Sequence, residues 1–376
     1  MIRLVPLIVA AWLIPLMSPA ETRIGVILPL SGGTAVWGEG IRRGIELADK
    51  SNPGSFHFIF EDEYFCDSAK AVAAAKKLLE LDSVRILITG CLNGTKAIAP
   101  LARSAGVPIF SAGFLDQASL SDSKYIISLS AQIGSEAAVL ARQLRAVGFK
   151  KIALFRHDDS FTGEFMQELA KGLQGVSAPV LTDYAVIDAT FPWSSKIALA
   201  RSEGTDAFLV YLGQDELLSF MRARRQLKDA TAVFSGYIIE SNFNPQEFGT
   251  ELNGIRYTYP QIAEAEDGQS QLFRQQFEAQ FGNAVSPSIN AYFVFDGLTV
   301  LASALRGCRS ASLDCLWPHF HNAGKHHRGV SGSFRFLDNG AIERAFILKE
   351  VQGSTFIPIG GSARPTGGNT PRKDNN

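Results

Sequence analysis

The stretch that decides the fold is Ile24-Gly-Val-Ile-Leu28-Pro-Leu-Ser31-Gly-Gly-Thr34-Ala-Val-Trp37-Gly-Glu-Gly-Ile-Arg-Arg-Gly-Ile-Glu-Leu-Ala48. Its apolar run, 24–28, is typical of a short parallel strand that is covered on both faces. The small residues of 31–34 predict a loop whose backbone can approach a ligand closely, and Trp37 is placed to overhang that loop. The apolar positions that follow recur with helical spacing. The stretch therefore predicts a strand, a binding loop and a helix of an α/β domain.

The first 20 residues have the composition of a secretory signal peptide. An apolar run, 4–17, follows a single arginine, and Ser18-Pro-Ala20 offers small residues for cleavage. We expect cleavage after Ala20 and a periplasmic protein. A membrane anchor is the alternative, but the run is too short to span a bilayer comfortably. The formal net charge of −1, with acids and bases interspersed, indicates neither a nucleic acid nor an anionic membrane surface as partner.

Strand and helix patterns alternate along the rest of the chain, which predicts doubly wound α/β domains with parallel sheets. Without its first 20 residues the chain still exceeds the roughly 250–300 residues at which a single core stops growing, so we expect two domains. The expected strands are 24–28, 56–61, 86–89, 109–111, 152–156, 207–212 and 233–235. The expected helices include 69–81, 97–105, 135–147 and 165–173.

The opening stretch, the strand-end glycines and Cys91 resemble the periplasmic binding proteins for leucine, isoleucine and valine, which supply ABC importers. The resemblance extends over nearly all of the chain after residue 20. It implies two lobes joined by a hinge of three chain crossings, with a ligand cleft between them. The ranges expected are 21–130 with 259–338 for lobe 1, 131–258 with 339–364 for lobe 2, and 365–376 for a disordered tail.

The same resemblance implies a small-molecule ligand that is captured by hinge closure and an inner-membrane permease as partner. We expect a monomer without a cofactor. Four cysteines, an even number in an exported chain, predict two disulfides. The resemblance implies the pair Cys66–Cys91, while Cys308–Cys315 is suggested by proximity and parity.

The loop Gly90-Cys91-Leu-Asn-Gly-Thr-Lys96 precedes a predicted helix. Free N–H groups near Asn93, Gly94 and Thr95 would suit a carboxylate. In amino-acid binders of the family, the residue after the matching cysteine is a serine that holds the ligand carboxylate, and here it is Leu92. The alternative is that Asn93 and Thr95 are plain helix caps.

The loop that follows strand 109–111 contains Gly113, Phe114 and Leu115. The family uses a backbone carbonyl at the position of Gly113 to accept from a ligand ammonium group. It has a threonine at the position of Leu115, so that hydroxyl is lost here. Phe114 is either part of the cleft wall or part of the core.

Two glycines mark strand ends in the second half, Gly213 and Gly236, at the spacing that the family shows. The resemblance places Gln214 where a tyrosine is expected. It places Ile238 where an acidic residue pairs with the ligand ammonium. Glu240 lies two residues further on, and on an extended segment it would face the same way as Ile238.

Aromatic residues stand at three positions where the family has tyrosines: Trp37 and Phe295 in the first lobe and Phe161 in the second. Each taken alone could equally be a core residue, whereas together they favour a cleft with aromatic walls. A zwitterion buried against Leu92, Leu115 and Ile238 would lack charged partners, at a cost of several kcal/mol for each. We therefore expect an aromatic or aliphatic acid or amide as ligand rather than an α-amino acid, with branched-chain amino acids as the alternative.

Three other classes of function remain as alternatives. His157-Asp-Asp could take part in acid–base chemistry, but no catalytic motif accompanies it, so we do not expect an enzyme. His319, His321, His326 and His327 lie close to two cysteines, yet Pro318 and the residues around it favour an exposed loop, and we expect no metal site. A soluble sensor that reports ligand occupancy to a membrane receptor is the third alternative.

Overall fold

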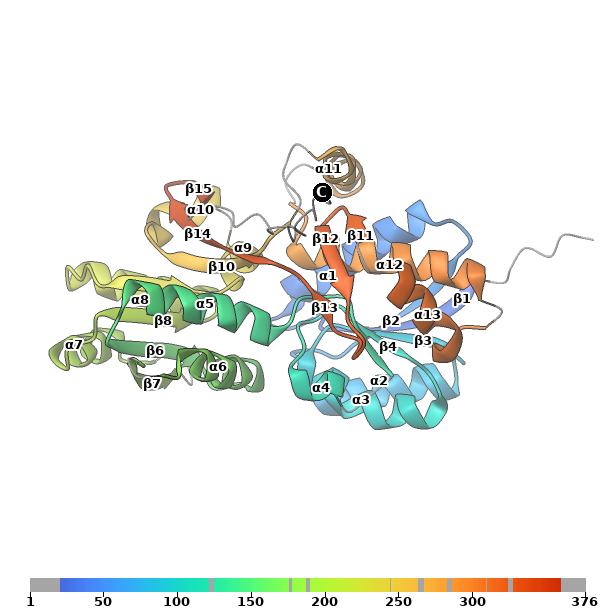
Figure 1. Ribbon diagram of the computed structural model, residues 1–376, viewed down its shortest axis with the longest axis horizontal. Coiled ribbons are helices and arrows are strands. Elements are labelled where there is room, and N and C mark those ends of the chain that lie inside the picture. The colour runs from blue at the N-terminus through green and yellow to red at the C-terminus, as the bar shows by residue number, and fades with distance from the viewer. Residues whose placement is uncertain are drawn as a thin grey trace, which may run out of the picture.

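The computed structural model describes residues 21–121, 125–175, 178–186, 190–243, 245–262, 267–282, 286–308, 310–323 and 327–359. The expected signal peptide at 1–20 and tail at 365–376 lie outside these ranges. Figure 1 shows two α/β lobes side by side, each with a central sheet and helices packed against it. The two main sheets are largely parallel, which confirms the predicted fold class.

The first lobe is built on a five-stranded parallel sheet in the order β2-β1-β3-β4-β5. Its strands are β1 (Thr22–Leu28), β2 (Phe56–Asp62), β3 (Ile86–Thr89), β4 (Ile109–Ser111) and β5 (Ile126–Ser128). The four residues of β3 and the last five of β1 are all buried, as expected for strands with helices on both faces. The apolar runs of the sequence therefore fix the centre of this sheet.

Helices from two distant parts of the chain cover this sheet. They are α1 (Ala35–Ser51), α2 (Ser68–Glu80), α3 (Leu92–Ala105) and α4 (Gln117–Ser121), and later α11 (Gly268–Phe281), α12 (Ile289–Gly307) and α13 (Leu313–Ala323). α12 packs along α1. A Cβ added to Gly44 would lie 2.6 Å from the carbonyl oxygen of Ala291, so glycine permits this close approach. The contact fixes α1, whose first turn carries Trp37.

The second lobe has a seven-stranded sheet in the order β15-β14-β10-β9-β8-β6-β7. Its strands are β6 (Lys151–His157), β7 (Val180–Val186), β8 (Ala207–Tyr211), β9 (Ala232–Ser235), β10 (Arg256–Pro260), β14 (Phe346–Gln352) and β15 (Thr355–Pro358). Its helices are α5 (Ile133–Val147), α6 (Ser160–Leu173), α7 (Trp193–Ser202), α8 (Gln214–Gln226), α9 (Ile238–Asn242) and α10 (Pro245–Leu252). Among the described strands of this sheet, β14 pairs antiparallel with β10 and with β15, and the other pairs are parallel.

A small antiparallel sheet of β11 (His327–Gly329), β12 (Gly332–Phe336) and β13 (Ile342–Glu343) lies beside the first lobe. The chain passes between the lobes after β5, after β10 and after β13, which gives the three crossings (Figure 1). The carbonyl of Gly340 accepts from the Ser128 amide at 2.8 Å, so the segment before the third crossing is tied to β5.

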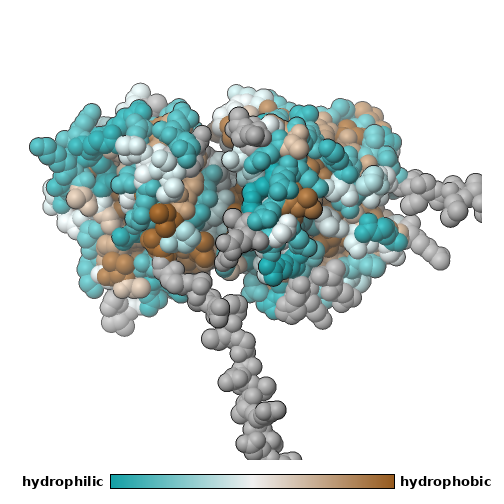
Figure 2. Space-filling view, turned by 90° about the horizontal axis from the view of Figure 1, so that it is seen from above, coloured by the Kyte–Doolittle hydropathy of each residue, from teal (hydrophilic) through white to brown (hydrophobic). Residues whose placement is uncertain are grey.

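Both predicted disulfides are formed, Cys66–Cys91 and Cys308–Cys315. From above, the two lobes form separate bodies that meet along a furrow (Figure 2). Within the described part of the chain, none of the helices combines the length and apolar composition that a membrane crossing requires.

Candidate ligand-binding cleft

Aromatic side chains from both lobes meet where the strand ends of the two sheets face one another. Phe114, after β4, stacks on Tyr237, after β9, with ring centroids 4.1 Å apart and an interplanar angle of 11°. Phe161, in the first turn of α6, lies edge-on to both rings at 6.5 and 6.2 Å. Trp37 reaches the edge of Tyr237 at 6.5 Å, and Tyr211 lies 5.7 Å from Phe161. We call Trp37, Phe114, Phe161, Tyr211 and Tyr237 the aromatic cluster.

The aromatic cluster joins the lobes in a closed arrangement. Phe114 is 1% exposed and Tyr237 2%, although each belongs to a different lobe. Their stack occupies the space between the strand ends, so a planar ligand could enter only when the lobes move apart. An open depression of about 540 Å³ lies elsewhere, at α7 and α8 on the second lobe, and none of the aromatic cluster lines it.

Glu136, from the first turns of α5, supports the aromatic cluster from within the second lobe. Its carboxylate accepts from the Tyr237 amide at 2.7 Å, from Thr258 Oγ1 at 2.8 Å and from the Tyr211 hydroxyl at 3.1 Å. Burial raises the pKa of Glu136 to about 7, and the three hydrogen bonds oppose that rise. The carboxyl group therefore holds the Tyr211 ring through its hydroxyl and the Tyr237 backbone through its amide.

Among the described residues, two buried N–H donors near the cleft have no hydrogen-bond partner. They are the indole Nε1 of Trp37 and the amide Nε2 of Gln132. Gln132 lies at the first crossing, where its backbone bridges to Leu115, the residue after Phe114. Because an unpaired buried donor is costly, both donors favour a ligand that carries hydrogen-bond acceptors.

The first turn of α3 differs from the open anion site that the sequence suggests. The Thr95 hydroxyl is engaged within the lobe, 2.7 Å from both Thr89 Oγ1 and the Cys91 carbonyl oxygen. Glu63 is fully buried, and its carboxyl group packs so tightly on Gly94 that a Cβ there would lie 2.1 Å from Oε2. A carboxyl group of the protein itself thus lies against this helix terminus.

The carboxyl group of Glu63 is poorly solvated. Neither of its oxygens has a hydrogen-bond partner of normal geometry. Burial raises its pKa to about 8, the negative charge of Asp62 adds to the rise, and the amide of Cys91 offsets it in part. The group is therefore protonated in the folded protein at neutral pH.

Four other predicted residues of the first lobe lie in the first turn of α3 or in the loop that follows β4. Leu92 is 6% exposed and Asn93 is partly exposed, both in the first turn of α3. Gly113 lies against the backbone of Gly90, where a Cβ would come within 2.1 Å of the carbonyl oxygen. Leu115 is fully buried, and its carbonyl accepts from the Ile133 amide at 3.3 Å. These residues shape the loop that holds Phe114.

Three predicted residues do not belong to the aromatic cluster. Gln214 is exposed at the start of α8. Phe295 packs edge-on to Phe273 of α11 at 5.0 Å. Ile238 is partly buried at the start of α9, directly after Tyr237.

Glu240 does not face the same way as Ile238, as it would on an extended segment, because α9 is helical. Its turn separates Glu240 from the direction of Ile238. Glu240 instead accepts from the Tyr257 hydroxyl at 2.7 Å and pairs with Lys349 on β14. Its charge is therefore used inside the second lobe.

An ion pair crosses between the lobes at the edge of the cleft. Lys96 on α3 pairs with Asp116 in its own lobe, and its Nζ lies 3.5 Å from Glu164 Oε1 on α6.

His157, which could suggest catalysis, accepts from the Gly213 amide at 3.1 Å and fixes the end of β8.

Sequence reasoning missed Tyr211, Tyr237 and Glu136. Tyr237 directly follows the strand-end glycine Gly236, and this position is a usable signal because strand-end loops line the cleft. Tyr211 ends a fully buried strand, where an aromatic residue reads as core. Glu136 carries no local signal, because its partners lie on three other elements.

Residues 21–355 match the family described as periplasmic binding protein. No curated protein matches the chain. Among solved structures, a leucine binding protein from Thermotoga maritima is 18% identical with a TM-score of 0.78, covering 90% of this chain and 98% of that one.

Two further structures are similar over comparable lengths. A solute binding protein of an ABC transporter from R. palustris, in complex with benzoate, is 18% identical with a TM-score of 0.76, covering 91% of this chain and 96% of that one. A branched-chain amino acid transporter substrate binding protein from Streptococcus pneumoniae, in complex with isoleucine, is 16% identical with a TM-score of 0.75, covering 90% and 99%. At these identities the likeness shows a common fold.

Proposed function

The chain belongs to the periplasmic binding protein family, and on this premise we propose that it is the solute-binding protein of an ABC importer. It captures a small ligand between its lobes by hinge closure and presents the closed form to an inner-membrane permease. The family consists of solute-binding proteins rather than enzymes. We assign the protein to the periplasm as a monomer, with cleavage after Ala20 and lobe boundaries at 21–130 with 259–338 and 131–258 with 339–364.

The observation that carries this proposal is the stack of Phe114 on Tyr237 across the junction of the lobes. Opening the lobes would part the two rings and expose an aromatic slot with Phe161 and Trp37 at its edges. A planar ligand that enters this slot contacts both lobes at once. It therefore favours closure, because only the closed form offers both sets of contacts.

The ligand class that fits this slot is an aromatic or aliphatic acid or amide. Burying a ring of roughly 150 Å² would contribute about 4 kcal/mol at 25 cal/mol per Å². The unpartnered N–H donors of Trp37 and Gln132 would serve the acceptor end of the ligand. The benzoate complex of the R. palustris relative supports the same class.

An α-amino acid fits less well. Ile238 offers no charge to an ammonium group, and Glu240 is already paired with Lys349. Glu136 already accepts three hydrogen bonds from its own lobe. A buried ammonium without a partner costs several kcal/mol, and each 1.4 kcal/mol is about tenfold in affinity.

A thermal-shift screen tests the proposal on the protein that starts at Glu21. Benzoate, benzamide, short aliphatic acids, leucine and isoleucine are compared at equal concentration. A ligand at about 100 times its Kd stabilises by roughly 2.7 kcal/mol, which raises the Tm by several degrees for a chain of this size. We expect benzoate or benzamide to do so. A response to leucine alone would overturn the ligand class and leave the binding role intact.

A further inference from the structure

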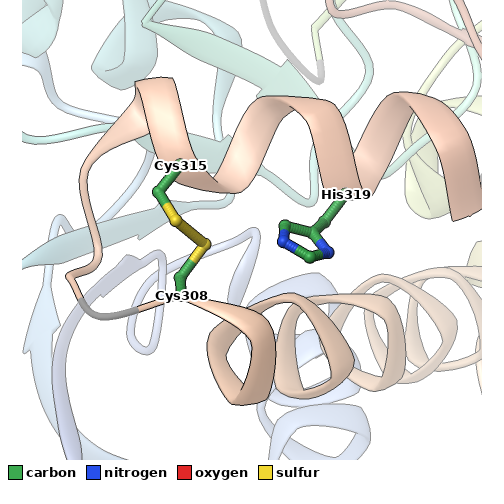
Figure 3. Close-up of side chains that lie close together, drawn as sticks. All are labelled: Cys308, Cys315 and His319. Atoms are coloured by element: carbon green, nitrogen blue, oxygen red, sulfur yellow. A yellow bond between two sulfur atoms is a disulfide. The ribbon is translucent and has the colours of Figure 1, made fainter.

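Two cysteines and a histidine gather at the end of the first lobe, far along the chain from the cleft residues. Cys308 directly follows α12, and Cys315 and His319 lie on α13. One ligand atom from each of the three lies within 4.8 Å of the others. Figure 3 shows the imidazole of His319 beside the disulfide that joins the two cysteines. This is the one group of three potential metal ligands that the described residues contain.

The segment is a helix rather than the exposed loop that the sequence favours around Pro318. Because α13 spans Leu313–Ala323, Cys315 and His319 are four residues apart on one helical face. Gly307 makes room for the imidazole, since a Cβ there would lie 2.5 Å from His319 Cε1. The histidine is thereby packed over the end of α12, next to Cys308. Backbone geometry thus holds all three side chains together.

We propose that this group is a redox-controlled metal site, which binds Zn²⁺ through Cys308, Cys315 and His319 when the disulfide is reduced. A dithiol reductant supplies two electrons and two protons, is itself oxidised to a disulfide, and breaks the S–S bond into two thiols. Each thiol then releases its proton when its sulfur binds the metal. The oxidised protein has no thiolate to offer and does not bind the ion there.

Zinc fits the donor set. Thiolate sulfur and imidazole nitrogen are ligands that Zn²⁺ prefers, at about 2.3 and 2.0–2.1 Å in tetrahedral geometry. The Cα atoms of the two cysteines lie 5.8 Å apart, so the sulfurs can separate around an ion through side-chain rotation. Two thiolates also balance the charge of the ion. His319 is exposed and both cysteines are half-buried, which gives the ion a path and leaves a fourth position for water.

The test is a titration of the full protein with Co²⁺, which reports on thiolate ligands through a charge-transfer absorption. The protein is reduced with an excess of a phosphine, which is removed before the titration under argon. We expect one equivalent of Co²⁺ to give the thiolate band in reduced protein and none in oxidised protein. Zn²⁺ should then displace Co²⁺ and abolish the band. Reduced protein that gives no band overturns the proposal.

Three variants separate this site from other ligands. Cys308→Ser/Cys315→Ser keeps the Cys66–Cys91 pair and should lose the band, so a band that persists there overturns the proposal. His319→Ala should weaken Co²⁺ binding at least tenfold. His321→Ala is the matched control on the same helix, because its Nδ1 lies 3.3 Å from Asp338 instead, and it should bind as the wild type does. Equal weakening by both histidine variants contradicts the assignment.

Discussion

At the scale of single residues, the cleft depends on a few side chains whose surroundings differ from those of ordinary core residues. Trp37 is partly buried at the start of α1, and its indole N–H lacks a partner. Glu63 and Glu136 are fully buried carboxyl groups, but only Glu136 has a full set of donors. All three side chains are poorly solvated and lie near the cleft. Single substitutions can measure what each contributes to binding or stability.

Trp37→Ala should weaken binding of the ligand found in the thermal-shift screen by about tenfold or more. Loss of the ring removes one wall of the aromatic cluster, and a tenfold change corresponds to about 1.4 kcal/mol. The measurement is calorimetric titration of both proteins. Leu272→Ala is the control, because Leu272 is a large apolar residue that is 54% exposed on α11 and lies outside the cluster. An unchanged Kd for Trp37→Ala would exclude the residue from the site.

Glu63→Gln should stabilise the protein at alkaline pH relative to the wild type. The folded-state pKa of about 8 lies above the ordinary value of 4.5, so the folded wild type holds a proton that the unfolded chain has released. Its stability therefore falls as the pH rises from about 4.5 to about 8. The amide does not titrate, so the variant escapes this loss.

Urea unfolding of the wild type and Glu63→Gln at pH 5 and pH 8.5 measures the effect. We expect the variant to gain at least about 1 kcal/mol on the wild type between the two values, since one pKa unit corresponds to about 1.4 kcal/mol. Glu136 titrates in both proteins and cancels in the comparison. A difference in stability that is constant with pH would contradict the raised pKa.

At the scale of elements, contacts at the helix termini determine which groups of the strand-end loops remain available to a ligand. Glu63, from the loop after β2, lies against the first turn of α3, so this terminus is not simply an open anion site. The single turn of α9 places Glu240 beside Lys349, with which it forms an ion pair. The Cys66–Cys91 disulfide joins the loop after β2 to the residue that precedes α3, and so fixes both parts of this arrangement.

Loss of the two disulfides should destabilise the protein unequally. Cys66 and Cys91 are 25 residues apart and Cys308 and Cys315 are 7 apart. Chain-entropy arguments then give about 3.5 kcal/mol for the first pair and about 2.4 kcal/mol for the second. Urea unfolding of Cys66→Ser/Cys91→Ser and Cys308→Ser/Cys315→Ser compares them. A larger loss for the second pair would mean that strain or packing outweighs loop closure.

At the scale of the whole molecule, the balance between open and closed lobes depends on weak contacts across the cleft. The stack of Phe114 on Tyr237 is worth about 0.5–1.5 kcal/mol beyond burial. The ion pair from Lys96 to Glu164 adds a screened contribution at the rim. Such small terms let the lobes part for a ligand and close again around it.

Glu164→Gln should shift the balance toward the open form and weaken ligand binding by up to about fivefold, since exposed ion pairs contribute about 0.2–1 kcal/mol. Added salt should reduce the difference from the wild type. Small-angle scattering and calorimetric titration at low and high salt measure both effects. Glu168→Gln is the matched control on α6, because Glu168 pairs with Lys171 of the same helix at 2.7 Å. An equal effect of the two substitutions would rule out a contact across the cleft.

The sequence by itself predicted the α/β class with two domains, seven of the strands that the structure describes and several of its helices, but not β5, β7 or β10–β15. Apolar runs such as 24–28 and 86–89 match β1 and β3, and the helix predicted at 69–81 matches α2 to within one residue at each end. These features are local, because periodicity and burial depend on the order of neighbouring residues. Trp37 and Phe161 were predicted because the resemblance places them where the family has tyrosines, and Phe114 because it lies in a loop after a predicted strand.

Only the tertiary structure decided which side chains meet. The stack of Phe114 on Tyr237 depends on the angle between two lobes, and no local pattern encodes that angle. The same holds for Glu136, whose three donors come from β8, from β10 and from Tyr237 between β9 and α9. The physical reason is that contacts between distant elements are fixed by how whole sheets pack and close, whereas the sequence pattern specifies each element separately.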